Sequence, residues 1–289
     1  MNAELSASDK KLSWEQAVVW ARETPAMASL VEACYYEDPI ESAARRFKAS
    51  EEWEAIVSLL NPQAGQKVLE IGAGRGILSW AFASEECEVY AIEPDPSAIV
   101  GAAAIRKLSA ATGQPINVVE TLGERIEFSD NTFDVVVCRA VLHHVSDLKM
   151  VSREVFRVLK PGGRFLAIKE HVAETPDELA AFLRAHPLHH LYGGEHAFAL
   201  GDYLQSFQVA GFTRVRNFGQ FDHAVTSYPP FSEKTIREMA ERSLTSRLPI
   251  WIASQLAQSE FIVRLYRRWA TFRCHTPGRL HSFLATKPA

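Results

Sequence analysis

Short apolar runs alternate with helical patterns through most of the chain. Seven runs have the length of strands, and the fourth, FDVVVCRA, is apolar almost throughout, as in a strand buried on both faces. They occupy residues 67–71, 88–94, 116–121, 133–140, 164–171, 213–221 and 279–287. Helical patterns separate the first five runs in units of about 30 residues, which is typical of a parallel sheet. We therefore predict an α/β fold with a doubly wound, seven-stranded, mostly parallel sheet.

Helical patterns also occur outside these alternating units. Residues 14–60 carry apolar side chains at three- and four-residue spacing, which predicts helices before the first strand. Residues 222–278 are mostly helical in pattern and too long for a plain connection between two strands. We therefore expect a helical N-terminal extension (1–49), a sheet domain (50–221 and 279–289) and a helical insertion (222–278) that serves as a lid.

Composition excludes several classes of protein. The 289 residues carry a formal net charge of −4, so the chain lacks the basic surface of a nucleic-acid-binding protein. The four cysteines are far apart in sequence, the start has no apolar secretion segment, and no apolar run approaches the length of a membrane span. We expect a cytoplasmic protein with free thiols. The composition indicates no oligomeric state.

The first predicted strand leads directly into a glycine-rich turn, VLEIGAGRG at 68–76. Glycines there allow positive φ, and the following helix N-terminus has unpaired N–H groups, so a ligand can lie against bare backbone. The spacing lacks the sixth-position glycine of a dinucleotide-binding turn. Glu93 ends the second strand, where a carboxylate can accept hydrogen bonds from a ribose diol. The structural alternative is that Glu93 caps a helix before Pro94 and Asp95.

Four motifs resemble those of class I S-adenosylmethionine-dependent methyltransferases: VLEIGAGRG, AIEPD, SDNTFDVVVCRAVLHHV and LKPGGRF. Their order and spacing are most similar to the small-molecule branch that includes the ubiquinone and menaquinone C-methyltransferases. The resemblance covers about residues 50–171. It implies the Rossmann-like methyltransferase fold and S-adenosylmethionine as cofactor. Because this family binds no pyrophosphate, the resemblance also accounts for the missing sixth glycine.

The resemblance implies roles for residues on the methionine side of the cofactor. Glu70 would order the start of the turn and hold the methionine amino group through water. Gly72, Ala73 and Gly74 would pass under the methionine and the ribose. Arg139, just after the fourth strand, would lie beside the methionine moiety through its backbone.

On the nucleoside side, the resemblance assigns the ribose diol to Glu93 and places Pro94 beside the adenine. The family often has an aspartate in a GDAExLPF pattern that binds the adenine amino group. The matching stretch here is TLGERIEF, with Leu122 at the aspartate position. Adenine recognition would then depend on backbone groups near Leu122 and Gly123, or on the side chain of Glu124.

Histidines follow the fourth and fifth predicted strands, at the sheet edge where ligands bind in such folds. Alignment and desolvation can supply most of the catalysis of methyl transfer, and a neutral histidine is a suitable base at neutral pH. We predict His144 as the catalytic base, His171 as the second candidate, and His143 beside them. An equally supported interpretation is that LHHV only shapes the loop, since many family members use no dedicated base.

A second histidine cluster lies in HPLHHLYGGEHAF, residues 186–198. Histidine and carboxylate side chains could bind a metal, but a proline and a glycine pair interrupt any regular helix, so we assign no metal ligands. We favour a loop that contacts the substrate over the alternatives of a metal site or an ordinary surface loop. The cluster consists of His186, His189, His190, Glu195 and His196.

These observations predict an enzyme that transfers a methyl group from S-adenosylmethionine to a small organic acceptor. O-methylation is slightly favoured over C- or N-methylation, because the histidines could deprotonate a hydroxyl. The alternatives are an S-adenosylmethionine-binding partner subunit without transferase activity and a nicotinamide-dependent oxidoreductase. Residues 251–272 form a basic, aromatic amphipathic pattern that could contact an anionic membrane, but we favour a lid helix there.

Overall fold

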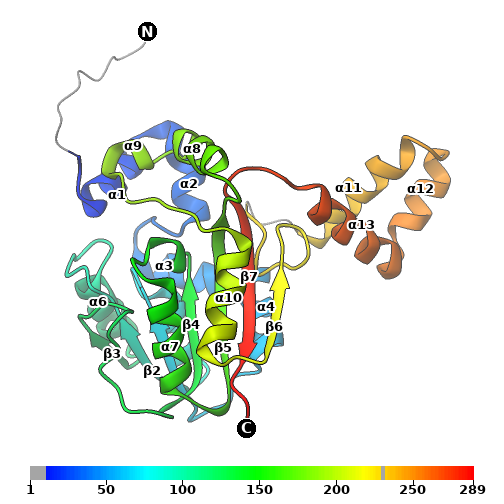
Figure 1. Cartoon of the computed structure of the whole chain (residues 1–289). Helices are drawn as coiled ribbons and strands as arrows, with labels where there is room; N and C mark the ends of the chain where they lie inside the picture. Colours follow the sequence, from blue (N-terminus) through cyan, green and yellow to red (C-terminus); the bar gives the residue numbers. More distant parts are fainter. Residues whose placement is uncertain (1–10, 229–231) are drawn as a thin grey trace.

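The structure is a computed structural model and describes residues 11–228 and 232–289. Its centre is a seven-stranded sheet in the order β3-β2-β1-β4-β5-β7-β6 (Figure 1). β7 runs antiparallel to its neighbours β5 and β6, and the other pairs are parallel. The strands are β1 (Lys67–Ile71), β2 (Glu88–Ile92), β3 (Ile116–Val119), β4 (Phe133–Arg139), β5 (Leu159–Val172), β6 (Arg214–Phe218) and β7 (Arg279–Thr286). The predicted fold class is confirmed.

Helices cover both faces of this sheet because successive strand residues point to opposite sides. On β4, Val135 and Val137 pack into one apolar cluster with α3, α4, α5 and α6, whereas Val136 and Cys138 pack into another with α7 and α10. These helices are α3 (Ile40–Lys48), α4 (Glu51–Leu60), α5 (Ile77–Ala83), α6 (Ala102–Thr112), α7 (Leu148–Val158) and α10 (Leu200–Ala210). β4 is therefore buried on both faces, as its continuous apolar run predicts.

Five short helical segments lie at the carboxyl ends of the strands or lead to them. α1, α2, α8 and α9 lie together above the sheet, at the top of Figure 1. The Leu12 N–H donates to the Leu191 carbonyl oxygen at 2.9 Å, and the Trp14 and Tyr192 rings lie 4.8 Å apart. The segments are α1 (Trp14–Glu23), η1 (Pro25–Met27), α2 (Ala28–Ala33), α8 (Pro176–Ala185) and α9 (His189–Tyr192). Residues 11–38 and the connection after β5, residues 173–195, thus form one cover, which we call the helical cover.

The helices of the insertion project sideways from the sheet, at the right of Figure 1. They are α11 (Glu233–Thr245), α12 (Ile250–Ala257) and α13 (Glu260–Arg273). Several large apolar side chains on α12 and α13 are exposed, among them Trp251 and Phe272. Across the described part of the chain, no helix combines the length and the apolar character needed to cross a membrane.

Candidate functional site

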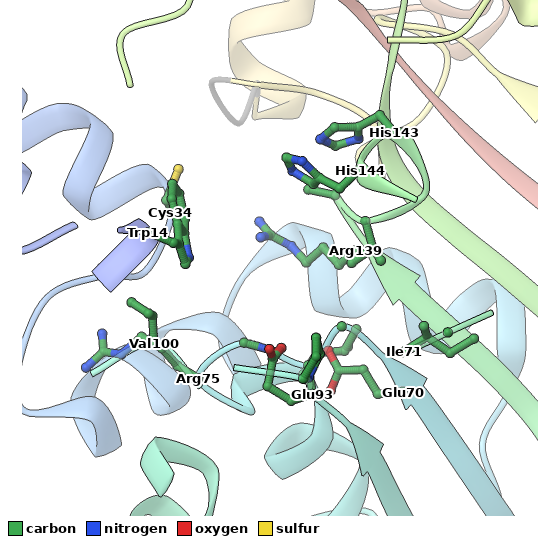
Figure 2. Close-up of a pocket in the computed structure, with 18 of the residues that line it drawn as sticks. Trp14, Cys34, Glu70, Ile71, Arg75, Glu93, Val100, Arg139, His143 and His144 are labelled. Carbon is green, nitrogen blue, oxygen red and sulfur yellow. The ribbon is translucent and has the colours of Figure 1, made fainter. Parts of the chain in front are cut away.

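A cavity of about 480 Å³ lies between the carboxyl ends of the central strands and the helical cover. It is within the size range of small-ligand sites. Figure 2 shows Glu70 and Glu93 at the bottom of the view, His143 and His144 at the top, and Arg139 between them. Twelve residues given a role from the sequence line this cavity: Glu70, Gly72, Ala73, Gly74, Glu93, Pro94, Leu122, Gly123, Arg139, His143, His144 and His171. Their individual roles stay predictions.

Gly72 and Gly74, in the turn between β1 and α5, differ in the space that surrounds them. Gly72 has φ +63°, and a Cβ there would lie 2.6 Å from Cγ2 of Val141, so protein packing alone excludes a side chain. Gly74 has φ +53°, but a Cβ there would have its nearest neighbour, the Val100 carbonyl oxygen, at 3.8 Å. The sequence suggests that these glycines lack side chains so that a ligand can approach. At Gly72 the side chain of Val141 already requires a glycine, without any ligand.

Glu93 joins the glycine-rich turn to the loop after β2. Its Oε2 accepts a hydrogen bond from the Gly74 N–H at 2.7 Å, and its Oε1 accepts one from the Asp95 N–H at 2.9 Å. Burial raises the pKa of Glu93 above its usual value. The helix-capping alternative does not hold, because α6 begins at Ala102 with Gly101 as its N-cap. Glu93 thus lies in the cavity and fixes the turn on which a ligand would lie.

Glu70, at the end of β1, is a buried carboxyl group in the cavity lining. It accepts a hydrogen bond from the Ser79 hydroxyl, and burial raises its pKa to about 8. At neutral pH the Glu70 carboxyl is therefore mostly protonated in the absence of a ligand. A cationic group beside it would favour the ionised form.

Arg139 is held by a buried ion-pair network that the sequence analysis missed. Its Nε donates to Oε1 of Glu52 at 2.8 Å, and Nζ of Lys169 donates to Oε2 of the same carboxylate at 2.6 Å. Burial alone would raise the pKa of Glu52, but the charges of Arg139 and Lys169 lower it to about 2. The sequence identifies Glu52 only as an acidic residue in the first turn of α4. Its contact with β4 and β5 depends on the tertiary fold.

Arg75, between the glycines of the turn, connects the turn to the helical cover. Its guanidinium donates to the carbonyl oxygens of Tyr35 at 2.9 Å and Glu37 at 2.8 Å, and pairs with the carboxylate of Asp38. The Arg75 side chain is almost completely buried. Arg75 was not predicted as a functional residue from the sequence, although an arginine inside a glycine-rich turn was a signal for one.

His143 is buried against Glu170, at the end of β5. Its Nδ1 lies 2.7 Å from Oε2 of Glu170, which also accepts the His143 backbone N–H at 3.1 Å. Burial lowers the pKa of His143 well below the usual value, so the ring is neutral near pH 7. A neutral ring that donates from Nδ1 has its lone pair on Nε2.

His144 and His171 have the same orientation relative to backbone acceptors. Nδ1 of His144 lies 2.9 Å from the Gly194 carbonyl oxygen, and Nδ1 of His171 lies 2.7 Å from that of Gly278. Because a carbonyl oxygen can only accept, each Nδ1 carries the proton. The Nε2 atom of each neutral ring is then free to accept a proton or bind a ligand. Burial lowers the pKa of His171, whereas the His144 side chain retains about a third of its exposure.

The segment 186–198 contributes two of its five cluster residues to the cavity lining. The Glu195 carboxylate lies 3.6 Å from Nε2 of His186 and 3.7 Å from Nε2 of His143. His190 and His196 are exposed and do not line the cavity. The sequence could not predict that Glu195 lies beside His143, because the two residues are far apart along the chain.

The insertion does not have the position expected of a lid. Within residues 222–228 and 232–278, no residue lines the cavity. The Tyr228 side chain interacts with Cys34, which lines the cavity, but Tyr228 itself does not line it. The helical cover therefore has the position that the sequence analysis assigned to residues 222–278.

Comparison with known proteins gives partial matches in the sheet domain. Residues 69–167 match a family model described as a methyltransferase domain. An uncharacterized methyltransferase, YcgJ of Bacillus subtilis, is 29% identical over 130 residues, which are 45% of this chain and 51% of the relative. The ubiquinone/menaquinone biosynthesis C-methyltransferase UbiE of Haemophilus ducreyi is 37% identical over 109 residues, 36% of this chain and 41% of the relative. A ubiquinone biosynthesis O-methyltransferase of Pseudomonas fluorescens is 37% identical over 103 residues, 35% of this chain and 43% of the relative. These matches span about half or less of the relatives' own length.

Solved structures share the fold over a longer part of the chain. The phosphoethanolamine N-methyltransferase 2 of Haemonchus contortus, in complex with phosphomonomethylethanolamine and S-adenosylhomocysteine, has a TM-score of 0.54 at 18% identity and covers 82% of this chain and 52% of its own. The YcgJ structure has a TM-score of 0.52 at 19% identity and covers 82% of this chain and 98% of its own. The chain therefore shares the fold of these solved methyltransferases. More specifically, residues 69–167 match a methyltransferase domain and are similar in sequence to small-molecule methyltransferases of ubiquinone and menaquinone biosynthesis.

Proposed function

We propose that this chain is an enzyme that methylates a small organic acceptor inside the cavity beneath the helical cover. When bound, S-adenosylmethionine supplies an electrophilic methyl group on a positively charged sulfur. One observation supports this proposal above the others. The glycine-rich turn with Glu93 and the histidines after β4 and β5 line the same cavity, so cofactor and acceptor could meet there.

The cavity lining fits the cofactor at both of its polar ends. Glu93 has its carboxylate beside Gly74, where it could accept hydrogen bonds from the ribose hydroxyls. Glu70 could ionise and hold the methionine amino group. Glu124 already accepts hydrogen bonds from the Ser146 N–H and hydroxyl, both at 2.9 Å. Both hydrogen bonds end on Oε1, so Oε2 of Glu124 and the backbone groups near Leu122 and Gly123 are both candidates for the adenine.

The histidines that line the cavity after β4 and β5 favour a methyl acceptor that loses a proton, such as a hydroxyl group. His144 has its proton fixed on Nδ1 by the Gly194 carbonyl oxygen, so Nε2 could take the proton of the acceptor. His171 is the second candidate base, by the same geometry. The helical cover would exclude water from the reacting atoms.

Isothermal titration of the purified chain separates the candidate functions. The proposal predicts micromolar binding of S-adenosylhomocysteine and no binding of NAD. A second measurement, incubation with labelled S-adenosylmethionine and a cell extract, should label a small molecule. Binding without any labelled product would favour the partner subunit. NAD binding without S-adenosyl binding would favour the oxidoreductase.

A further inference from the structure

Imidazoles and one carboxylate from separate parts of the chain meet at the acceptor end of the cavity. His143 follows β4, His171 lies at the end of β5, and Glu195 belongs to the segment after α9. One ligand atom of each of these three residues lies within 4.8 Å of the other two. His143 and Glu195 are buried, and His171 is mostly buried. Figure 2 shows the His143 ring next to that of His144 at this end of the cavity.

Nδ1 of His143 and Nδ1 of His171 each already have a hydrogen-bond partner. Nδ1 of His143 is paired with the Glu170 carboxylate, and Nδ1 of His171 with the Gly278 carbonyl oxygen. Metal-binding histidines almost always donate their second ring N–H to a carboxylate or a backbone carbonyl in this manner. The arrangement leaves Nε2 of each ring as the atom available for an ion. With an ion on its Nε2, His171 could not also serve as the base, which leaves His144 for that role.

The Glu195 carboxylate lacks the partner that its burial requires. Its Oε1 accepts the Tyr192 hydroxyl, but its Oε2 is buried and has no hydrogen-bond partner. Nε2 of His143 and of His144 lie 3.7 and 3.9 Å from Oε2, too far for hydrogen bonds. Among the described residues, Glu195 forms ion-pair contacts only with histidines and none with lysine or arginine. A buried carboxylate oxygen without a partner is costly, and a cation beside Oε2 would remove that cost.

We propose that His143, His171 and Glu195 bind one divalent transition-metal ion, with Zn²⁺ the best match. Two imidazole nitrogens and one carboxylate are a ligand set found in catalytic zinc sites that keep an open fourth position. In a tetrahedral zinc site, the bond lengths place two such ligand atoms about 3.3 Å apart. The ligand atoms here lie within 4.8 Å of one another, so each distance between them would shorten by about 1.5 Å or less when the ion binds. His186, near Oε1 of Glu195, would help to orient the carboxylate.

All three ligand residues line the cavity, so an open fourth position of a bound ion would be reached from it. The ion would therefore bind the donor atom of the acceptor and lower the pKa of an acceptor hydroxyl or thiol. This role rests on the proposed function, whereas metal binding itself does not.

The test uses tag-free, chelator-treated chain titrated with Zn²⁺ or Co²⁺ in the absence of cofactor and acceptor. The proposal predicts one bound ion per chain by elemental analysis, and visible absorption typical of four-coordinate Co²⁺. Glu195→Gln and His171→Ala should each raise the Kd for Zn²⁺ by at least about tenfold. The matched control is His190→Ala, an exposed histidine of the same segment, which should bind Zn²⁺ as wild type does.

Circular dichroism and S-adenosylhomocysteine binding show whether each variant is folded, and Glu195→Gln preserves the shape of the side chain. Wild-type chain that retains no ion after titration would overturn the proposal without reference to any variant. Unchanged Zn²⁺ affinity in folded Glu195→Gln would overturn it as well. Because no methyl transfer is measured, failure here is distinct from failure of the proposed enzyme activity.

Discussion

The guanidinium of Arg75 donates to the carbonyl oxygen of Tyr35 at 2.9 Å, which ties the glycine-rich turn to the helical cover. The same side chain also bonds to Glu37 and Asp38, so Arg75 contacts three residues of the connection between α2 and α3, which Arg22 and Arg46 also hold. The turn on which we propose the cofactor to bind is therefore joined directly to the cover above it.

Arg75→Ala should destabilise both the fold and the cofactor site. It leaves buried carbonyl oxygens without donors, at a cost of about 1–3 kcal/mol in the free energy of unfolding. We expect a weaker S-adenosylhomocysteine affinity and faster proteolysis within residues 11–38. Arg75→Lys retains the positive charge but not the planar guanidinium with its several N–H donors. Its stability and S-adenosylhomocysteine affinity should therefore lie between those of Arg75→Ala and wild type. Denaturant unfolding, titration and limited proteolysis check this; wild-type values in all three would show that Arg75 does not hold the cover.

Glu93→Ala should raise the Kd for S-adenosylhomocysteine at least about tenfold, because two ribose hydroxyls would lose their acceptor and Gly74 its partner. The matched control is Glu88→Ala, an exposed carboxylate on the same strand, which should bind normally. Titration calorimetry measures both variants. An unchanged Kd for Glu93→Ala would refute the ribose assignment.

Glu70 should make stability depend on pH. Its folded pKa of about 8 exceeds the ordinary value of 4.5, so the folded state binds more protons and stability falls as pH rises from about 4.5 through 8. The Glu70→Gln side chain cannot ionise, so the variant lacks this loss of stability. The free energy of unfolding of Glu70→Gln minus that of wild type should therefore increase by a few kcal/mol from pH 5 to pH 9. Urea unfolding without cofactor at several pH values measures this difference. A difference that stays constant with pH would contradict the raised pKa.

Cofactor binding should also release a proton near neutral pH. If Glu70 ionises beside the methionine amino group, wild type releases up to one proton when S-adenosylmethionine binds, and Glu70→Gln releases less. Calorimetry in buffers with different ionisation enthalpies counts the protons. Equal proton release in both proteins would mean that Glu70 does not change its charge.

His144→Ala should lower kcat by about 10²–10⁴-fold if this residue is the base for a hydroxyl acceptor. His196→Ala, an exposed histidine outside the cavity, is the control and should retain normal turnover. The rate of label transfer from S-adenosylmethionine to the identified acceptor gives kcat. A normal turnover number for His144→Ala would exclude it as the base.

The sheet and its ligand-binding edge were predictable because they depend on local patterns. Two-residue periodicity separates Val135 and Val137 from Val136 and Cys138, and parallel strands bring Glu70, Glu93 and His143 to one edge. Such relationships follow from strand geometry and do not require knowledge of distant contacts.

The cover and its contacts depend on residues far apart in sequence. Glu52 reaches Arg139 across 87 residues and Arg75 reaches Tyr35 across 40. Helical periodicity shows which face of a helix is apolar, but not where the helix docks. The lid was therefore assigned to 222–278, although residues from 14–36 and 186–195 line the cavity from the side of the helical cover.

A crystal structure of the chain with S-adenosylhomocysteine tests the central claim most directly. The account predicts the ribose hydroxyls on the Glu93 carboxylate, the adenine beside Pro94 and Leu122, and the homocysteine amino group near Glu70. A nucleoside bound elsewhere on the chain, or a cavity closed by protein side chains in the complex, would contradict it.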